Sequence, residues 1–540
     1  MRAPPRLPVL ATCAAAAALV LWPLATLPWF EQHEGTRYFI RLVALARNLV
    51  AQGGHPTWIP ELAGGHGYPL FGFYSPGVLT LALPFLPLGP VAAIKAVLFL
   101  ALTFGAFGLY LLGERLHGPA GGTLTAALGV GAPYAMADLF TRGDVAEYVA
   151  LCAAPWLLLL AVRTVEEGRR RDHWLLALGY GLFVPLHTVS ALLWSGVLVA
   201  LLLVMALARR QGPRRIAAYG GALALGLALS AWYWLPAMAE RGLIHQEVLR
   251  EGYFDFRRNF LPSPLFGPQS VSEPPMYLGW PLLLGAAVGL AAALRSERRA
   301  DTLALVALGA VLTWLTTESA AAVWETAPLL SFAQFPWRLL GPASVLLALA
   351  AAGAATPIPS RHGRMLPPAA LLFVFVMAPD SRLLRPLPVE PSELDLDHLA
   401  RTRVELLGYG EYAPATMPLD SPPPPGEPLA WLAGEGSADA SMDGVRVRVE
   451  VQSEGTTLTL SQLHFPGWVV TVDGAVVPHS HDAKGRMVVE VPAGRRVVEA
   501  RFRDTPIRAA AKWVSLLAVG ALAFGVWRTT RAHRPRPIQG

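Results

Sequence analysis

Long apolar segments separated by short arginine clusters dominate the first 380 residues of the chain. Many of these segments have close to the roughly 20 apolar residues that a helix needs to cross a bilayer. Arginine clusters between such spans are typical of cytoplasmic loops. Placing every cluster inside predicts about twelve spans. Residues 76–89 ("PGVLTLALPFLPLG") are then re-entrant or interfacial, since a full crossing would invert the topology downstream. The predicted spans are 8–29, 91–112, 119–137, 148–163, 174–187, 189–208, 216–234, 277–293, 302–317, 338–354, 365–379 and 508–527.

The polar segments between these spans define the domains that we expect. A multi-span domain covers 1–379, an outside region covers 380–507, and 508–540 form the last span with a cytoplasmic tail. The outside region contains a proline-rich linker, "SPPPPGEP", and alternates apolar and polar residues from Val445 onward. This alternation, with the Asp-Gly turn of "WVVTVDGAVV", predicts an antiparallel β-sandwich of about six strands at about 443–507. The other segments expected outside are 30–76, 138–147, 235–276 and 318–337.

Composition agrees with a polytopic α-helical membrane protein. Of 540 residues, 54% are hydrophobic and 15% charged, against about 25% charged in soluble domains. The net charge of +6 is concentrated in the short loops, so it indicates topology rather than nucleic-acid binding. Two cysteines in apolar segments predict no disulfide framework. The sequence contains no P-loop, GxSxG, CxxC or HExxH motif, which argues against nucleotide-driven transport, soluble redox chemistry and zincin-type proteolysis.

The first outside loop opens with ionisable residues directly after the first span, among them His33 and Glu34. Residues 36–50 then place Arg37, Arg41 and Asn48 on one stripe, which predicts an amphipathic interfacial helix with this stripe toward lipid phosphates. A carboxylate just before the first turn is favoured in its ionised form. Glu34 is therefore a helix cap, a general base, or a metal ligand beside His33, and spacing alone favours the cap.

A glycine- and proline-rich stretch, "WIPELAGGHGYPLFGFYSPG" (58–77), follows this helix. Its composition predicts a compact irregular loop lined by rings. Trp58, His66, Tyr68 and Tyr74 are candidate substrate-binding residues, with aromatic rings that can stack on sugars. The same aromatic residues also suit the belt of rings found at membrane interfaces.

Two further outside segments carry candidate chemistry. In "DLFTRGDVAEY" (138–148), Arg142 can pair with a phosphate, and Asp144 or Glu147 can bind a cation or exchange a proton; an internal Arg–Glu pair explains the segment equally well. In "SFAQFPWR" (331–338), Gln334 and Arg338 can bind a lipid headgroup, although interfacial anchoring is the simpler interpretation.

Together, residues 33–54 and 58–76, "RGDVAEY" (142–148), "QFPWR" (334–338) and the segment 464–502 around "HFPGW" carry a resemblance to a known family. The chain resembles the GT-C superfamily of polytopic glycosyltransferases. More narrowly it resembles the YfhO-like bacterial membrane proteins and relatives labelled "6-pyruvoyl-tetrahydropterin synthase-related". The pterin-synthase part of that label implies a His-rich zinc site, for which the sequence offers no motif.

The resemblance implies an inverting-type transfer of a sugar from a polyprenyl-phosphate donor to a cell-envelope acceptor, on the outer face of the cytoplasmic membrane. His33-Glu34 replaces the His-Asp that relatives usually show, so Glu34 would be the base, with His33 orienting it. Asp144 and Glu147 would assist as carboxylates, and Arg142 with Arg37 or Arg41 would hold the donor phosphate. A divalent cation, Mg²⁺ or Mn²⁺, would bind at Glu34 and Asp144.

The resemblance also assigns a part to the β-domain, in which His464 and Trp468 would cover the site or bind acceptor glycan. Two other classes of function stay open. One is a non-catalytic transporter or scaffold for lipid-linked glycans, and the other is a structural envelope protein that uses the β-sandwich to bind partners. We therefore expect the protein to bind membrane lipids, a lipid-linked sugar and its acceptor, but no nucleic acid.

Overall fold

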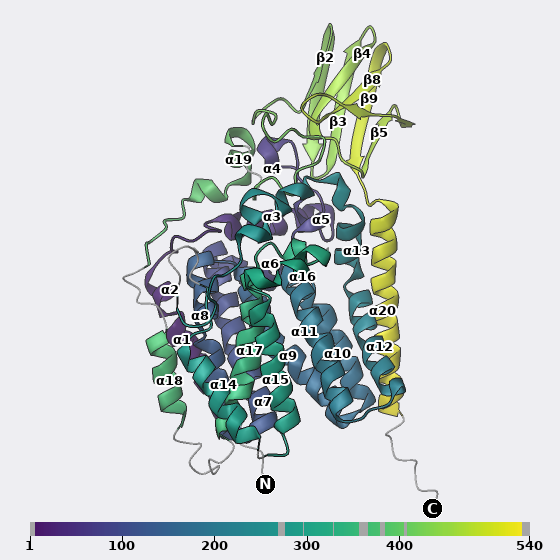
Figure 1. The fold of residues 1–540 in the computed structure, drawn as a ribbon. Helices are drawn as coiled ribbons and strands as arrows, with labels where there is room; N and C mark the ends of the chain where they lie inside the picture. The colour runs from purple at the N-terminus through teal and green to yellow at the C-terminus, as the bar shows by residue number, and fades with distance from the viewer. Residues whose placement is uncertain are drawn as a thin grey trace, which may run out of the picture.

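A helical bundle with a β-domain at one end makes up the protein (Figure 1). The computed structural model describes residues 6–267, 276–294, 296–327, 329–355, 366–377, 384–403 and 408–531. The bundle helices are α1 (Arg6–Val20), α7 (Pro90–Val130), α8 (Pro133–Ala137), α9 (Val145–Glu167), α10 (Arg170–Phe183), α11 (Thr188–Ala208), α12 (Pro213–Leu229), α13 (Ala231–Ala239), α14 (Trp280–Ala293), α15 (Arg299–Trp314), α17 (Leu340–Ala351), α18 (Leu366–Met377) and α20 (Pro506–Arg531). Shorter helices are α2 (Trp22–Thr26), α3 (Arg37–Gln52), α4 (Leu62–Gly65), α5 (Leu70–Phe73), α6 (Gly77–Ala82), α16 (Ala321–Thr326) and α19 (Leu396–Thr402).

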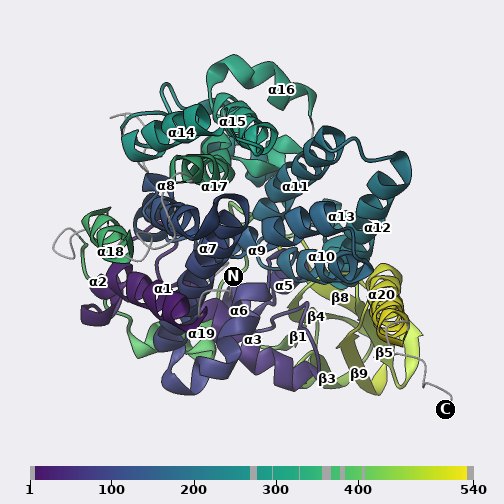
Figure 2. The same ribbon diagram turned by 90° about the horizontal axis from the view of Figure 1, so that it is seen from below.

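A helix stands at each position where the sequence predicts a span. Within the described residues, five helical segments are long and apolar enough to cross a membrane, and seven if two bent helix pairs each count as one span. Seen along the bundle, α7 and α9 lie near its centre and the other helices surround them (Figure 2). Residues 77–88 form α6 and a 3₁₀ turn instead of a full-length span, which agrees with the predicted re-entrant or interfacial segment.

The 41 residues of α7 form two antiparallel arms. One straight helix of that length would be about 60 Å long, twice the thickness of the hydrocarbon core. Gly118 breaks the helix with a φ of +80°. A Cβ on Gly122 would lie 2.6 Å from the carbonyl oxygen of Tyr110, so the second arm runs back along the first. The two arms correspond to the predicted spans 91–112 and 119–137.

In the described part of the chain, the arginine-rich loops that follow α9, α11 and α14 gather at the end of the bundle opposite the β-domain (Figure 1). There, Arg298 contacts Glu166 at 2.5 Å, and Arg209 contacts Asp301 at 2.8 Å. Arg115 joins the same network through Glu166 at 2.8 Å. Loops far apart in sequence therefore meet at one end, as the predicted topology requires.

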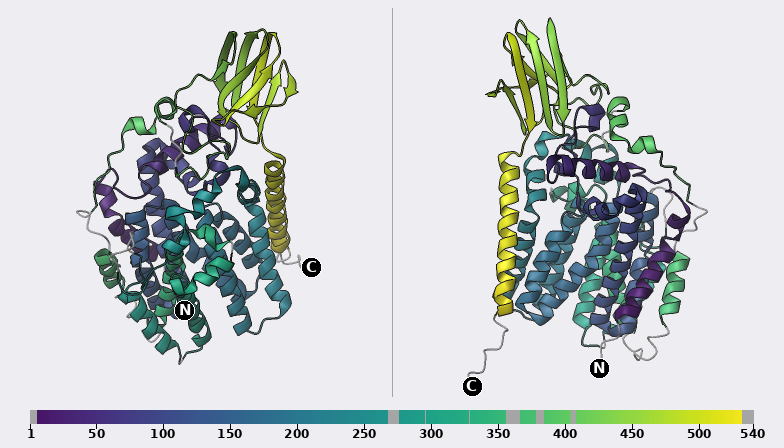
Figure 3. Two further views of the ribbon diagram at one scale, coloured as in Figure 1. Left: turned by 45° about the horizontal axis from the view of Figure 1, so that its top comes forward. Right: turned by 180° about the vertical axis from the view of Figure 1, so that it is seen from behind.

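Helix α3 lies across the opposite end of the bundle, below the β-domain (Figure 3). Its polar stripe faces the protein interior, because Arg41 and Asn48 are only 3% and 1% exposed. Arg41 contacts Glu34 at 3.0 Å, and Asn48 donates a hydrogen bond to Glu61. The prediction that this stripe faces lipid phosphates is wrong for Arg41 and Asn48, because carboxylates from flanking loops are their partners.

The β-domain is a two-sheet antiparallel sandwich with strand orders β1-β4-β8-β7 and β2-β3-β9-β5-β6. It begins at Ala430, earlier than the predicted 443, because the small and acidic residues of β2 hide its alternation. The Asp473–Gly474 turn joins β5 to β6 as predicted, with both residues at positive φ. The strands are β1 (Ala430–Leu432), β2 (Gly436–Asp443), β3 (Arg446–Ser453), β4 (Thr456–Leu463), β5 (Trp468–Val472), β6 (Ala475–Val477), β7 (Ser480–His481), β8 (Arg486–Val491) and β9 (Gly494–Phe502).

The first outside loop attaches the β-domain to the bundle. The indole of Trp58 donates a hydrogen bond of 3.0 Å to Gln462, and its ring stacks on Phe502. The imidazole of His66 lies 2.7 Å from the carbonyl oxygen of Ser461. The proline-rich segment 421–428 packs on the same loop, where Gly426 donates to the carbonyl of Gly64.

Candidate functional site

A buried cluster of acids and arginines lies where α8 turns into α9. Residues 138–142 form a π-helical turn, and Asp144 caps α9 by accepting the backbone N–H of Glu147 at 3.0 Å. This geometry turns Arg142 toward three carboxylates. Its guanidinium lies 2.6 Å from Asp138, 2.7 Å from Glu147 and 3.1 Å from Asp144. The internal pairing foreseen for this segment is therefore present.

Arg338 brings the "QFPWR" motif into the same cluster. Its Nε donates to Glu147 at 2.8 Å, and another guanidinium nitrogen lies 3.6 Å from Asp144. Gln334 orients the guanidinium of Arg338 by accepting a hydrogen bond of 3.0 Å from it. Tyr134 donates a hydrogen bond to the other oxygen of Glu147. Two motifs almost 200 residues apart thus meet in one place.

The charges in this cluster set the protonation of its acids. Burial alone would raise the pKa of Asp144, but His187, Arg142 and Arg338 lower it below its ordinary value. Burial, reinforced by the charge of Glu147, raises the pKa of Asp138 well above its ordinary range. Asp144 is therefore held as a carboxylate, whereas Asp138 favours its protonated form.

His187 belongs to this site, although the sequence shows it only as a lone histidine after a proline. It caps α11 by accepting the backbone N–H of Ser190, and its Nε2 lies 3.8 Å from Asp144. The signal that could have identified it is its position at the outer end of a span, facing the same compartment as Asp144.

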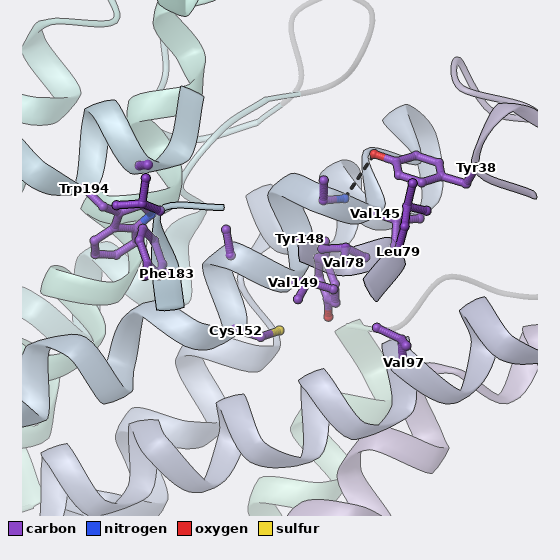
Figure 4. Packing of buried hydrophobic residues seen from close by; sticks show 14 of the residues in the cluster. Tyr38, Val78, Leu79, Val97, Val145, Tyr148, Val149, Cys152, Phe183 and Trp194 are labelled. Carbon is purple, nitrogen blue, oxygen red and sulfur yellow. Dashed lines mark hydrogen bonds between the residues drawn. The ribbon is translucent and has the colours of Figure 1, made fainter. Parts of the chain in front are cut away.

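A second group, from the first outside loop, lies beside this cluster. Glu34 pairs with the buried Arg41, whose guanidinium lies 4.3 Å from the centre of the Tyr74 ring. Tyr38 connects the two groups, since its hydroxyl donates a 2.9 Å hydrogen bond to Asp144. Figure 4 shows Tyr38 reaching the start of α9 beside Val145. The first-loop acid and the 138–148 acids therefore converge.

The exposure of Glu34 distinguishes it from the buried acids. Its side chain is 27% exposed, while that of Arg41 is 4% exposed. It does not cap α3, because Thr36 occupies the N-cap position without a side-chain bond and Glu34 contacts Arg41 instead. His33 beside it is exposed. A carboxylate that is held on one side and open on the other is suited to accept a proton.

A strip of aromatic rings runs between the two groups. We call Tyr409, Phe254, Phe335 and Trp337 the aromatic strip; successive ring centres are 4.9, 5.9 and 4.8 Å apart. Arg37 lies over Tyr409 at one end, at 5.3 Å, and Arg142 lies over Trp337 at the other, at 4.6 Å. Tyr409 is 54% exposed, so the Arg37 end of the strip faces solvent.

Several predicted substrate-binding residues lie at the joint with the β-domain instead of at an open surface. Trp58, His66 and Tyr68 are at most 1% exposed. Trp468 of the "FPGW" turn is 4% exposed and meets the ring of Trp58 edge-on at 5.8 Å. Trp58, His66 and Trp468 are buried in the attachment of the β-domain, and Tyr68 is buried as well, so no face of these rings is open to a sugar.

The predicted cation was tested against the donor atoms present. Within the described residues, Asp144, Glu147 and His187 bring ligand atoms within 4.8 Å of one another, without Glu34. Both oxygens of Asp144 and both of Glu147 already accept hydrogen bonds from Tyr38, Tyr134, Arg142, Arg338 or the Glu147 backbone. Two guanidinium groups neutralise this set, so it fits a divalent cation poorly.

Comparison with known proteins places the chain in a family. The family model described as "6-pyruvoyl-tetrahydropterin synthase related domain; membrane protein" matches residues 68–381, more than half of the chain. The chain belongs to this family. The match makes it a membrane protein, in agreement with its apolar helices.

The other comparisons add little to this assignment. A search of curated proteins gave no significant match. Among solved structures, the chain is similar to the arabinofuranosyltransferase AftD from Mycobacteria, with 18% identity over 69% of this chain and a TM-score of 0.44. The chain spans about a quarter of the length of that protein, 26%. This likeness is too distant to carry an argument about fold or function.

Proposed function

We propose that the protein is an integral-membrane glycosyltransferase that moves a sugar from a polyprenyl-phosphate donor to an acceptor outside the cytoplasmic membrane. The observation that carries this proposal is the partly exposed Glu34 carboxylate, held by Arg41 beside the buried acid cluster. The motifs that resemble the GT-C superfamily supply the reaction class. The site lies at the end of the bundle that carries the β-domain (Figure 3).

Glu34 acts as the base in this proposal. One of its oxygens contacts Arg41, which leaves the other for the acceptor hydroxyl. As the acceptor oxygen bonds to the anomeric carbon, its proton moves to Glu34. The bond from that carbon to the phosphate oxygen breaks, and the polyprenyl phosphate leaves with the electron pair. Because phosphate is a good leaving group, positioning and charge compensation are the main tasks of the protein.

Arg37 is the best candidate for the donor phosphate. In the described part of the chain, its guanidinium contacts the Tyr409 ring and no carboxylate. Arg41 and Arg142 were expected to share this role, but carboxylates already neutralise both. The exposed end of the aromatic strip beside Arg37 offers apolar surface for the sugar or the first prenyl units.

The buried cluster positions this site and is not required to contact substrate. Arg142 and Arg338 fix Asp144 and Glu147, and Asp144 in turn accepts from Tyr38 on α3. This chain of contacts holds the helix that carries Arg37 and Arg41. No step assigned here uses a cation.

One observation favours a second candidate, a non-catalytic transporter or scaffold for lipid-linked glycans. Every carboxylate oxygen of Asp144 and Glu147 already has a partner, as expected of a purely structural cluster. Glu34 separates the two candidates, since only the enzyme needs its carboxylate.

The test is turnover by the purified protein of a panel of short-chain polyprenyl-phosphate pentoses and hexoses, read as released polyprenyl phosphate. We expect Glu34→Gln to lower turnover by about 10²–10⁴-fold in a protein that still folds, with a modest fall in the melting temperature because the buried Arg41 loses an opposite charge. Glu31→Gln is the matched control, because Glu31 is a more exposed acid in the same loop, 56% exposed. Full turnover in Glu34→Gln contradicts the proposed base, and no turnover of any donor by the wild type supports the scaffold.

A further inference from the structure

Three histidines gather on the β-domain, outside the site described above. His464 follows β4, His479 precedes β7 and His481 lies in β7. The ring of His464 lies between the other two, with centres 5.1 Å from His479 and 5.5 Å from His481. In sequence the set is hidden, because 14 residues separate His464 from the His-Ser-His segment.

Two of the ring separations in this set are close to those of imidazoles that share one metal ion. Zinc binds histidine nitrogen at about 2.0–2.1 Å in tetrahedral geometry, which places the centres of two ligand rings about 5 Å apart. The two ring separations measured here fall at that value. The nearest carboxylate in the sequence, Asp482, is engaged by Arg486 at 2.7 Å, so the available donors are imidazoles.

The ring nitrogens also have capacity for a ligand. Nε2 of His479 lies 3.2 Å from the carbonyl oxygen of Trp468, and its Nδ1 is buried with no hydrogen-bond partner among the described residues. Nδ1 of His481 lies 3.0 Å from the carbonyl oxygen of Asp482, so its Nε2 is the nitrogen that can bind a metal ion.

We propose that His464, His479 and His481 form a binding site for a first-row transition-metal cation such as Zn²⁺, with a fourth position open to water. Three imidazoles suit Zn²⁺, Cu²⁺ or Ni²⁺ and not Mg²⁺ or Ca²⁺. Among the described residues, the ligand atoms of these three rings do not all lie within 4.8 Å of one another; those of Asp144, Glu147 and His187 do. His481 is exposed, and the proposed site requires its ring to rotate toward His464 and His479.

The bound ion would join the end of β4 to the segment that leads into β7. Trp468, whose carbonyl contacts His479, packs against Trp58 in the joint to the bundle. The ion therefore stabilises the part of the β-domain that meets the first outside loop. The proposal is independent of the glycosyltransferase assignment and of the family match, which ends at residue 381.

The experiment uses the full chain in detergent, purified through an affinity tag that contains no histidine. Zn²⁺ is titrated against a competing chelating dye, and Co²⁺ is added separately to report coordination through its visible spectrum. The test variant is the double substitution His479→Ala with His481→Ala. The control His398→Ala removes a half-buried histidine elsewhere, and Glu147→Gln monitors the acid cluster.

We expect the wild type to bind one more Zn²⁺ than the double variant and to give the intense spectrum of four-coordinate Co²⁺. Both controls keep that ion. Zn²⁺ should also raise the melting temperature of the wild type but not of the double variant, which separates loss of the site from a folding defect. Equal Zn²⁺ stoichiometry in the double variant, or an octahedral Co²⁺ spectrum in the wild type, overturns the proposal.

Discussion

At the scale of single residues, Arg142 pairs with the acids of its own segment, while Tyr38 and Arg338 bring in contacts from distant parts of the chain. Asp144 and Glu147 were expected to face the same compartment as Glu34, and Tyr38 joins the groups. The contribution of Arg338 could not be predicted, because it lies 191 residues from Glu147. From the sequence, Trp58 and His66 resemble ligand-binding residues, because the strand that buries them lies about 400 residues later in the chain.

Arg142 provides a test at this scale. Arg142→Ala leaves Asp144 and Glu147 with one guanidinium in place of two, and breaking buried pairs in this way costs about 3–5 kcal/mol. We expect a clear fall in the melting temperature in detergent, whereas Arg215→Ala, an exposed arginine of the opposite end, has little effect. Unchanged stability with lost donor binding would instead make Arg142 a ligand of the donor phosphate.

At the scale of elements, periodicity and arginine position predicted where helices stand. The Gly118–Pro119 reversal within α7 is encoded locally, so two spans could be expected there. The orientation of α3 could not be predicted, because an amphipathic helix can turn its polar stripe either toward lipid headgroups or toward buried carboxylates. Strand β1 was missed because it has three residues, and β2 because its small and acidic residues lack a clear alternation.

Close packing of α14 on the end of α17 gives a test at the scale of elements. A Cβ on Gly289 would lie 2.1 Å from the backbone oxygen of Ala350, which cannot move without shifting its helix. Gly289→Ala should therefore destabilise the bundle by about 1–3 kcal/mol. Gly220→Ala on α12 meets nothing within 4 Å and should be neutral or stabilising. Equal melting temperatures for the two variants would contradict this packing.

At the scale of the whole molecule, the attachment of the β-domain is the feature that sequence patterns did not predict. Strand patterning identified the sandwich, but its contact with the first outside loop depends on pairs such as Trp58 and Gln462. Gln462 also donates to the carbonyl of Gly65, so one side chain bonds twice across the joint.

Gln462→Ala tests this attachment. The substitution leaves the buried Trp58 indole and the Gly65 carbonyl without partners, at a cost of about 1–3 kcal/mol each. We expect limited proteolysis within residues 418–435 to become several-fold faster, measured against the exposed-site control Gln452→Ala. Equal cleavage rates in both variants would show that the joint does not depend on these bonds.

The most direct test of the proposed glycosyltransferase is native mass spectrometry of the protein purified from its own membrane. The account predicts a co-purifying polyprenyl phosphate in the wild type, lost in Arg37→Ala, and retained with its sugar intact in Glu34→Gln. The absence of any such lipid, under conditions in which a known GT-C enzyme keeps one, would contradict the account and favour the scaffold.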